Sequence, residues 1–392
     1  MPHFDRILDH VESPKWRRRL YSVKRVLQRL RPFGGMSEGN YIEVFKEQHV
    51  ILAQMLSAIE QAQKRVWLET YIYEGDAVGT KIRDALIDAR TRGCEVILLY
   101  DHFGSSRLPR GFMTPLLKAG AEVVNFNPIW AWRRKGPLLF RNHRKVLIID
   151  EDLSFCGSMN ISLNPGMSFR DTVMKIKGPA TQELGRLFLE ALQETTGEEK
   201  SDSYVPAQYP GGVFAQVLAS NQRRKIVSIQ RSMELSLNRA TTYCYFTTPY
   251  FLPHAGLRKA MIEAAERGVD VRVLTAGLSD VPLMRLAAQY VYSLFLRAGI
   301  RIYELDGQTL HAKTAVIDGI YAWVGSYNLD HWSARRNLEV NVGVIDPYLA
   351  DELEAHFDAD LESSREISWA VWRKRSWFRR IVNFMAYQVM RL

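Results

Sequence analysis

Two pairs of histidine and lysine are the residues of this sequence best suited to chemistry. His143 and Lys145 stand two positions apart in the run NHRKVLIID, and His311 and Lys313 stand two positions apart in LHAKTAVID. Each run is typical of a buried strand, and residues i and i+2 of a strand share one face. Each imidazole should therefore point the same way as the neighbouring ammonium group, toward a common ligand.

An imidazole beside an ammonium group suits a phosphate. Lysine and an asparagine amide can bind the non-bridging oxygens, while imidazole can attack phosphorus or move a proton near neutral pH. Metal binding is the weaker alternative, because a protonated lysine adds repulsion and offers no lone pair. We therefore expect no metal and no other cofactor.

The continuation of the two runs is repeated as well. Both copies read His-x-Lys-x4-Asp and then Gly-Ser-x-Asn, and matching positions differ by 168 residues, as in 143 and 311. The members are His143, Lys145, Asp150, Gly157, Ser158 and Asn160 in the first copy, and His311, Lys313, Asp318, Gly325, Ser326 and Asn328 in the second. Asp171 and Glu339 follow at the same offset, so a duplicated fold has duplicated a site.

A pseudo-twofold axis that brought both motifs together would place the two imidazoles across one phosphodiester. One histidine would attack in line and form a phosphohistidine, while the other, protonated, would give a proton to the departing alkoxide. The second histidine would then activate an incoming hydroxyl.

The other members of the motifs have distinct expected roles. Asp171 and Glu339 should hold the imidazole tautomer through a hydrogen bond. Asp150 and Asp318 belong to the catalytic motif but stand at odd offsets from their histidines, so we expect them to orient the following loop. Substrate phosphate binding is expected of the serine and asparagine of each copy: Ser158, Asn160, Ser326 and Asn328.

The elements that position these residues are also written twice. Residues 54–100 and 232–275 each give a helix, a strand rich in aromatic and β-branched residues, a second amphipathic helix ending at Arg-Gly, and another strand. Helices that alternate with strands indicate α/β layering. We predict two similar α/β domains, each a mixed sheet flanked by helices, related by pseudo-twofold symmetry, with the active site at their interface.

The chain divides into four segments around a polar, Gly- and Pro-rich linker at residues 196–212. They are a basic amphipathic N-terminal arm (1–35), a first domain (36–200), a second domain (201–366) and a basic-aromatic amphipathic C-terminal segment (367–392).

Both terminal segments combine aromatic residues with many Arg and Lys. Trp16 lies in the first segment, and Trp372, Trp377 and Phe378 lie in the last. Such a composition suits a helix in the lipid interface, with cations on anionic headgroups. A helix docked on its own protein would have the same composition, but two such ends favour contact with a membrane.

Composition limits the class of protein. The 392 residues carry a net charge of +9, which implies an anionic partner, either nucleic acid or acidic lipid. No apolar stretch reaches the roughly 18 residues that cross a bilayer, and no signal peptide is evident, so we expect a chain that neither spans a membrane nor is exported. Three scattered cysteines, Cys94, Cys156 and Cys244, are typical of buried thiols in a reducing compartment.

The doubled His-x-Lys-x4-Asp with Gly-Ser-x-Asn resembles the phospholipase D superfamily, from about residue 40 to 365. Within it, the segments VWLETYIYEGDAVG, FRNHRKVLIID and VGSYNLDHWSARRNLEVNV are similar to those of bacterial cardiolipin synthases, particularly the shorter form without N-terminal transmembrane helices. The resemblance implies two phospholipase D-like domains.

The resemblance also implies an activity. One phosphatidylglycerol would give its phosphatidyl group to His143 and release glycerol, and the hydroxyl of a second would take the group to give cardiolipin, with His311 as acid and then base. The implied partners are phosphatidylglycerol and an anionic phospholipid surface, with no nucleic acid. The implied location is peripheral, on the cytoplasmic face of the bacterial cell membrane.

Other activities share the same first step. A phospholipase D-type hydrolase or a transphosphatidylase acting on other phospholipids would use the same motifs. A nuclease of the superfamily would also suit the net positive charge, but the basic-aromatic termini and the lack of an evident stacking groove disfavour it. A catalytically idle membrane scaffold would require both motifs to have lost their purpose. The sequence gives no indication of oligomeric state.

One insertion breaks the duplication. From Gly120 to His143 takes 23 residues, whereas from Gly299 to His311 takes 12. The extra segment places two tryptophans, Trp130 and Trp132, beside three cations. We expect these tryptophans to contact the membrane and to line the lipid entrance to the site.

Overall fold

The strands of the first half form one mixed sheet. The computed structural model describes residues 33, 35–129, 137–163, 168–200, 207, 209 and 212–391. The order of the first sheet is β1 (Met36–Phe45), β9 (Val173–Lys177), β7 (Leu153–Gly157), β6 (Val146–Ile149), β2 (Arg65–Thr70), β3 (Glu95–Asp101) and β4 (Glu122–Phe126). The pairs β2–β3 and β3–β4 are parallel, and the other pairs are antiparallel.

The second half repeats this order strand for strand. Its sheet runs β10 (Val213–Asn221), β17 (Asn337–Ile345), β16 (Tyr321–Gly325), β15 (Thr314–Ile317), β12 (Tyr243–Thr247), β13 (Asp270–Leu278) and β14 (Arg301–Leu310). Again only the pairs that correspond to β2–β3 and β3–β4 are parallel within this order. The predicted pair of similar α/β domains with mixed sheets is thus confirmed.

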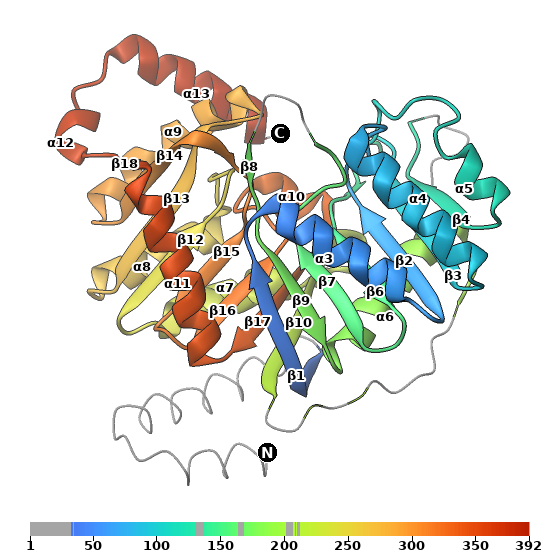
Figure 1. Cartoon of the computed structure of the whole chain (residues 1–392). Helices are drawn as coiled ribbons and strands as arrows, with labels where there is room; N and C mark the ends of the chain where they lie inside the picture. Colours follow the sequence, from blue (N-terminus) through green and yellow to red (C-terminus); the bar gives the residue numbers. More distant parts are fainter. Residues whose placement is uncertain are drawn as a thin grey trace, which may run out of the picture.

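Helices cover both sheets (Figure 1). The first half contains α3 (Gln48–Gln61), α4 (Ala77–Thr91), α5 (Thr114–Lys118) and α6 (Ala180–Thr196), and the second contains α7 (Ser228–Arg239), α8 (Ala255–Glu266), α9 (Pro282–Arg297), α10 (His331–Arg335) and α11 (Pro347–Glu362). Side chains fix where several of them begin: Asp76 caps α4 by accepting from Gly79 N at 2.9 Å, and Asp346 caps α11 by accepting from Leu349 N at 2.8 Å.

The two halves share a hydrophobic core. One cluster of buried side chains combines Ile148 and Met174 of the first sheet with Val342 of the second and Phe188 of α6. Strand β1 adds a backbone link, because its residues Met36–Asn40 pair with β10 while Tyr41–Phe45 pair with β9. The sheets therefore pack together as parts of a single structure.

Two short strands of the first half pair with strands of the second half. β5 (Arg141–Asn142) pairs in parallel with the start of β17, and β8 (Phe169–Arg170) pairs in parallel with the end of β14. β5 leads directly into the first histidine motif, and β14 leads into the second. The crossing thus brings both motifs to the seam between the halves.

Several sequence predictions concern residues that lie outside the described part. These are Trp16 and nearly all of the N-terminal arm, Trp130 and Trp132 of the insertion, and most of the linker. The segment boundaries stay a prediction.

The C-terminal segment forms α12 (Trp369–Trp372) and α13 (Trp377–Arg391), and β18 (Ser364–Glu366) pairs with β14 just before them. Within the described ranges, no helix has the length and apolar character needed to cross a membrane. All three cysteines are free and buried, as expected.

Candidate active site

The first histidine and lysine lie buried at the entrance to β6. His143 is 8% exposed and Lys145 is 5% exposed. Nδ1 of His143 lies 3.0 Å from Oε2 of Glu339, and Nζ of Lys145 donates to the His143 carbonyl at 2.6 Å. The carboxylate fixes the ring through Nδ1, so Nε2 is the nitrogen that is left for a substrate.

The second pair repeats this geometry at the entrance to β15. Nδ1 of His311 lies 2.7 Å from Oδ1 of Asp171, and Nζ of Lys313 donates to the His311 carbonyl. Both residues are buried. The duplicated sequence has therefore folded into duplicated local geometry.

The acids are exchanged between the halves. Glu339, which follows the second motif, holds the histidine of the first, and Asp171, which follows the first motif, holds the histidine of the second. The crossing strands cause this exchange: His143 N donates to Leu338 O at 3.0 Å, and His311 N donates to Arg170 O at 2.9 Å. The site is thus assembled from both halves.

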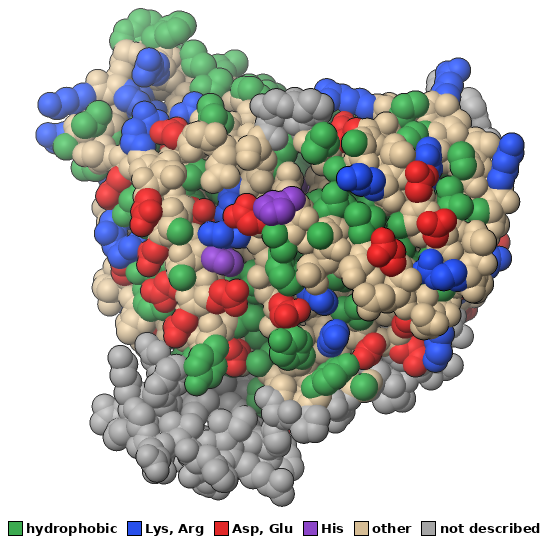
Figure 2. Space-filling view, in the orientation of Figure 1, with side chains coloured by type: hydrophobic (Ala, Val, Ile, Leu, Met, Phe, Trp, Pro, Cys, Tyr) green, Lys and Arg blue, Asp and Glu red, His purple; other side chains and the backbone are tan. Residues whose placement is uncertain are grey.

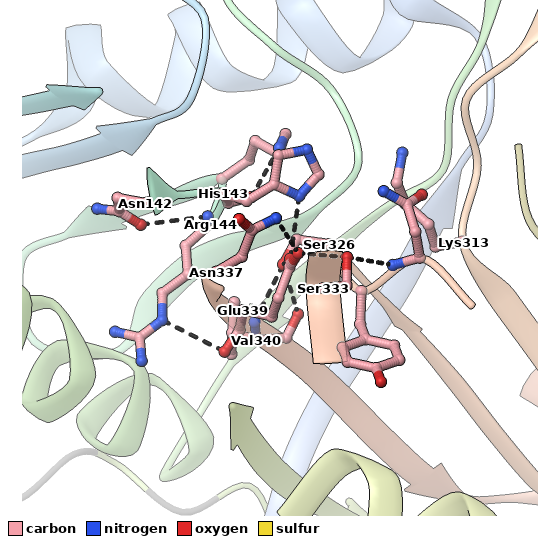
Figure 3. A network of polar contacts seen from close by, with 12 residues as sticks. Asn142, His143, Arg144, Lys313, Ser326, Ser333, Asn337, Glu339 and Val340 are labelled. Atoms are coloured by element: carbon pink, nitrogen blue, oxygen red, sulfur yellow. Dashed lines mark hydrogen bonds and ion pairs between the residues drawn. The ribbon is translucent and has the colours of Figure 1, made fainter. Parts of the chain in front are cut away.

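Glu339 is the centre of a dense polar network (Figure 3). Its Oε1 accepts from Ser333 Oγ at 2.7 Å and from Asn337 Nδ2 at 3.1 Å, while Oε2 contacts His143. Asp171 has fewer partners, one of which is Gln48, whose Nε2 donates to Oδ2 at 2.9 Å. Each carboxylate is therefore held in place before it can hold its histidine.

The two serines face the carboxylates that hold the histidines, and phosphate binding by their hydroxyls stays a prediction. Ser158 Oγ donates to Asp171 Oδ1 at 2.6 Å, and Ser326 Oγ donates to Glu339 Oε2 at 2.5 Å. Each hydroxyl also accepts from a backbone amide, that of Thr172 or Val340. A hydroxyl has one hydrogen to donate, and here a carboxylate receives it. The serines therefore support the acids that orient the histidines.

The asparagines of the two motifs differ in their contacts. Asn160 accepts with Oδ1 from Ile72 N at 3.2 Å, which leaves its amide nitrogen without a hydrogen bond among the described residues. Asn328 is buried, and its Oδ1 has no partner in the described part of the chain. Phosphate binding by either amide stays a prediction.

The motif aspartates lie at the far ends of their strands. Asp150 and Asp318 follow β6 and β15 with φ of 50° and 53°, in the left-handed region that Asp tolerates better than most residues. Asp150 accepts from the amides of residues 63–65 and Asp318 from those of residues 241–243, at 2.7 to 3.2 Å. Both carboxylates accept hydrogen bonds from the backbone amides that lead into the neighbouring strand. They are therefore not placed to contact a ligand between the imidazoles.

Burial and crowded cations set the protonation of the site. Burial lowers the pKa of His143 to about 4 against the opposing effect of Glu339, with Lys145 adding to the decrease. Burial and then Lys313 lower the pKa of His311. The pKa of Lys313 falls to about 8 through burial, and that of Lys145 falls well below its usual value through burial and Lys313. Because each lysine also acts on the opposite pair, the two motifs lie within electrostatic reach of one another.

The acids remain ionised. Burial alone would raise the pKa of Asp171, but the contacts with His311, Ser158 and Lys313 lower it well below its usual range. Glu339 behaves in the same way beside His143 and Lys145. The site therefore holds two carboxylates, two lysines and two imidazoles, an arrangement that can bind an anion and move a proton.

The family of the chain can be read from comparison with known proteins. A family model described as cardiolipin synthase, PLD-like domain, matches residues 55–191 and 234–361. The chain belongs to this family. Cardiolipin synthase 1 of Bacillus cereus is 33% identical over 347 residues, covering 84% of this chain and 68% of that protein. The major cardiolipin synthase ClsA of Bacillus subtilis is 31% identical over 355 residues, covering 88% and 73%.

Solved structures show the same fold at low sequence identity. Phosphatidylserine synthase of Haemophilus influenzae superposes with a TM-score of 0.73 at 13% identity, covering 94% of this chain and 99% of that one. Polyphosphate kinase of Porphyromonas gingivalis gives a TM-score of 0.59 at 15% identity, covering 84% and 49%. Such likeness concerns the fold alone.

Two aromatic rings beside the imidazoles were missed in the sequence. The Tyr71 ring lies 4.9 Å from that of His143, and the Phe169 ring lies 5.6 Å from that of His311, both edge-on. Tyr71 follows β2 and Phe169 begins β8. Tyr71 directly follows an aromatic-rich strand, and the position of that strand's end beside the site is the signal that could have indicated it.

A set of buried polar residues that holds the His143 strand was also missed. Arg141 forms a buried ion pair with Asp101 at 3.3 Å, and Asp101 also accepts from Asn142 N at 2.9 Å. The Asn142 amide donates to Glu69 at 2.6 Å. Two acids near the carboxyl ends of β2 and β3 thus fix the two residues before His143, and their position at adjacent strand ends was the available signal.

The predicted membrane contacts divide into two groups. Trp377 and Phe378 are 73% and 64% exposed at the start of α13. The prediction is wrong for Trp372, which is 9% exposed and packs with its ring 5.2 Å from that of Tyr292 on α9. An amphipathic pattern alone does not distinguish lipid from a neighbouring helix, and α9 covers this tryptophan.

Proposed function

We propose that this protein is a cardiolipin synthase that joins two phosphatidylglycerol molecules and releases glycerol. The observation that carries the proposal is the pair of buried imidazoles at one seam, each held by a carboxylate from the other half, in a chain that belongs to the cardiolipin synthase family. The cardiolipin synthases of Bacillus match most of the chain, which supports a phosphatidyltransferase activity.

The first step is attack by His143 on the phosphorus of a donor phosphatidylglycerol. With a pKa of about 4, His143 is neutral near pH 7, and the Glu339 contact at Nδ1 leaves the Nε2 lone pair for phosphorus. A P–N bond forms as the P–O bond to glycerol breaks. His311, protonated at Nε2, gives that proton to the departing glycerol oxygen.

The protonated state of His311 depends on the substrate. Burial lowers the pKa of His311 in the free site, but a phosphate anion between the rings raises it, and ionised Asp171 stabilises the imidazolium. Lys145 and Lys313 are near the same centre and compensate the charge of the non-bridging oxygens. The Asn160 amide is a further donor for this phosphate.

The second step reverses the proton transfer. His311, now neutral, accepts the proton of a hydroxyl on a second phosphatidylglycerol, whose oxygen attacks the phosphohistidine. The P–N bond breaks, His143 is restored and cardiolipin is formed. Water would give phosphatidic acid instead, so exclusion of water decides between transfer and hydrolysis.

The membrane surface supplies both substrates. The exposed Trp377 and Phe378 support binding at a lipid interface, and the net charge of +9 favours anionic lipid. We place the protein on the cytoplasmic face of the bacterial membrane, in agreement with free, buried cysteines.

The test uses vesicles that contain phosphatidylglycerol labelled in its free glycerol. Purified protein should form cardiolipin and release one labelled glycerol for each cardiolipin formed. A protein with both histidines changed to alanine should neither form cardiolipin nor release glycerol. Phosphatidic acid as the main product would replace the proposal with a hydrolase. Cleavage of DNA without turnover of the lipid would replace it with a nuclease.

A further inference from the structure

A second pocket lies apart from the imidazoles, beneath the C-terminal helices. It has a volume of about 730 Å³ and is enclosed by α9, β18, α12 and α13. None of its lining residues belongs to either histidine motif. Figure 1 shows α12 and α13 folded over the end of the second sheet that carries α9 and β14.

The pocket is lined by more cations than anions. Four arginines, Arg285, Arg365, Arg375 and Arg379, face two carboxylates, Glu304 and Glu366. Glu304 is buried and accepts from Arg285 at 2.8 Å and from Arg365 at 2.9 Å, so its negative charge is already neutralised by these two ion pairs. Arg375 and Arg379 form no ion pair with any residue in the described ranges.

Two residues that line the pocket carry buried donors that lack acceptors. Nε1 of Trp372 and Nε of Arg285 are buried and have no hydrogen-bond partner in the part of the chain that the structure describes. Buried polar groups are nearly always hydrogen-bonded, so these two unpaired donors are unusual, but each atom is closed off from the pocket by its neighbours. The preference of the pocket for an anion therefore comes from its arginines.

Arg375 is the most constrained of these cations. Its guanidinium carbon lies 3.1 Å from the centre of the Trp372 ring, and its Nε donates to the Trp372 carbonyl at 3.2 Å. Burial, Arg380 and Arg379 lower its pKa to about 10. Cations crowded in this way are stabilised by an anion bound among them.

The rim of the pocket is apolar. Val371 and Phe378 line it and are 71% and 64% exposed. Along α13 the exposed side chains Ile381, Met385 and Val389 continue this surface away from the pocket. Figure 2 shows lysine and arginine side chains beside hydrophobic ones at the corner that α12 and α13 occupy. A free phosphate would use only the cations, whereas an amphiphile would use both surfaces.

We propose that this pocket binds the phosphate of one anionic phospholipid, with its acyl chains along the exposed apolar side chains of α13. Arg375 and Arg379 would bind the non-bridging oxygens of that phosphate. The lipid would be held and not converted. The inference rests on the proposed function only for its membrane setting, since lipid binding here requires no turnover.

The test counts lipids bound to the full chain, with His143→Ala in every protein compared so that no lipid is converted, by calorimetric titration with dihexanoylphosphatidylglycerol below its micelle concentration. Arg375→Gln combined with Arg379→Gln should remove one bound lipid per chain or weaken that class of site at least about tenfold, which is about 1.4 kcal/mol. Arg373→Gln combined with Lys374→Gln removes the same charge from exposed residues outside the pocket and should leave binding unchanged.

Two further measurements keep the proposal open to disproof. Arg379→Gln alone removes an exposed side chain that forms no ion pair with a described residue, so the melting temperature should not change. Weaker lipid binding by this variant at an unchanged melting temperature would exclude a folding effect. Equal loss in both double variants, or in neither, would refute the site. Inorganic phosphate binding as tightly as the lipid would refute the role of the acyl chains. Failure of turnover would affect the proposed synthase alone, because the titration does not depend on it.

Discussion

Oδ1 of Asp171 lies 2.7 Å from Nδ1 of His311, a residue 140 positions later that belongs to the other half of the chain. Glu339 and His143 form the reciprocal contact at 3.0 Å. Each step of the proposed reaction therefore depends on both halves. The consequences can be separated by experiment, because each acid acts on a different histidine.

The two histidines should respond differently to the leaving group. His143→Ala and His311→Ala should each lower synthesis of cardiolipin at least about 10²-fold, since one removes the nucleophile and the other the proton donor. With a p-nitrophenyl ester of phosphatidic acid, whose leaving group needs no proton, His311→Ala should still release a burst of nitrophenol. A burst from His143→Ala instead would exchange the two roles.

The acids should follow the histidine that they contact. Glu339→Gln should slow the burst with the nitrophenyl ester, whereas Asp171→Asn should leave the burst and slow the synthesis of cardiolipin, each by about 10²-fold or more. Circular dichroism of both variants serves as the folding control. If Asp171→Asn abolishes the burst and Glu339→Gln spares it, the acids do not act on the histidines that they contact.

The pH dependence should follow Lys313. Its pKa of about 8 in the folded protein means that its positive charge is present below that pH and is lost as the pH rises through it. Binding of a phosphate needs the charge, so kcat/KM should fall above about pH 8. Lys313→Arg, if it retains activity, should extend the plateau, because arginine stays charged. A plateau that ends at the same pH in both proteins would assign this limb to another group.

Membrane binding should depend on the exposed aromatic residues of α13. Trp377→Ala combined with Phe378→Ala should reduce partitioning to anionic vesicles at least about tenfold, because a buried large side chain contributes ~1.5–3 kcal/mol. Phe103→Ala is the control, since Phe103 is 56% exposed in the first half of the chain. The fraction of protein that sediments with the vesicles measures this partitioning. An equal decrease for the Phe103→Ala control would show that the membrane contact lies elsewhere.

The ion pair behind His143 should matter for folding. Asp101→Asn leaves the buried Arg141 without its charge partner and should lower the free energy of unfolding by about 3–5 kcal/mol. Arg107→Ala breaks a pair with Glu74 in which Arg107 is 83% exposed, and should cost about 1 kcal/mol or less. Urea unfolding measures both. Similar midpoints for the two variants would show that Asp101 is not a structural anchor.

Much of the fold could be predicted because the sequence is duplicated. The equal offset of every motif residue predicted two similar domains and a site at their seam, and the matched acids drew attention to Asp171 and Glu339. The exchange could not be predicted, since the spacing is the same whether each acid holds its own histidine or the other one. Only the parallel pairing of β5 with β17 and of β8 with β14 decides it.

Other parts of the site depend on contacts that a pattern does not contain. Ser158 and Ser326 could have faced substrate or acid, and the choice follows from the position of β9 and β17 beside them. Trp372 lies in a segment whose composition suits a membrane interface, but its ring is covered by α9. Asp101 and Glu69 were overlooked because single acids near strand ends are common in any α/β sequence.

The strand exchange also bears on how such a chain could arise. One copy of the repeat carries an acid that cannot reach its own imidazole, because β8 and β5 carry that acid and that imidazole to the opposite sheet. A single-copy ancestor would have been competent only as a homodimer. In this chain the two copies are covalently joined, so the meeting of the two motifs does not depend on the concentration of the protein.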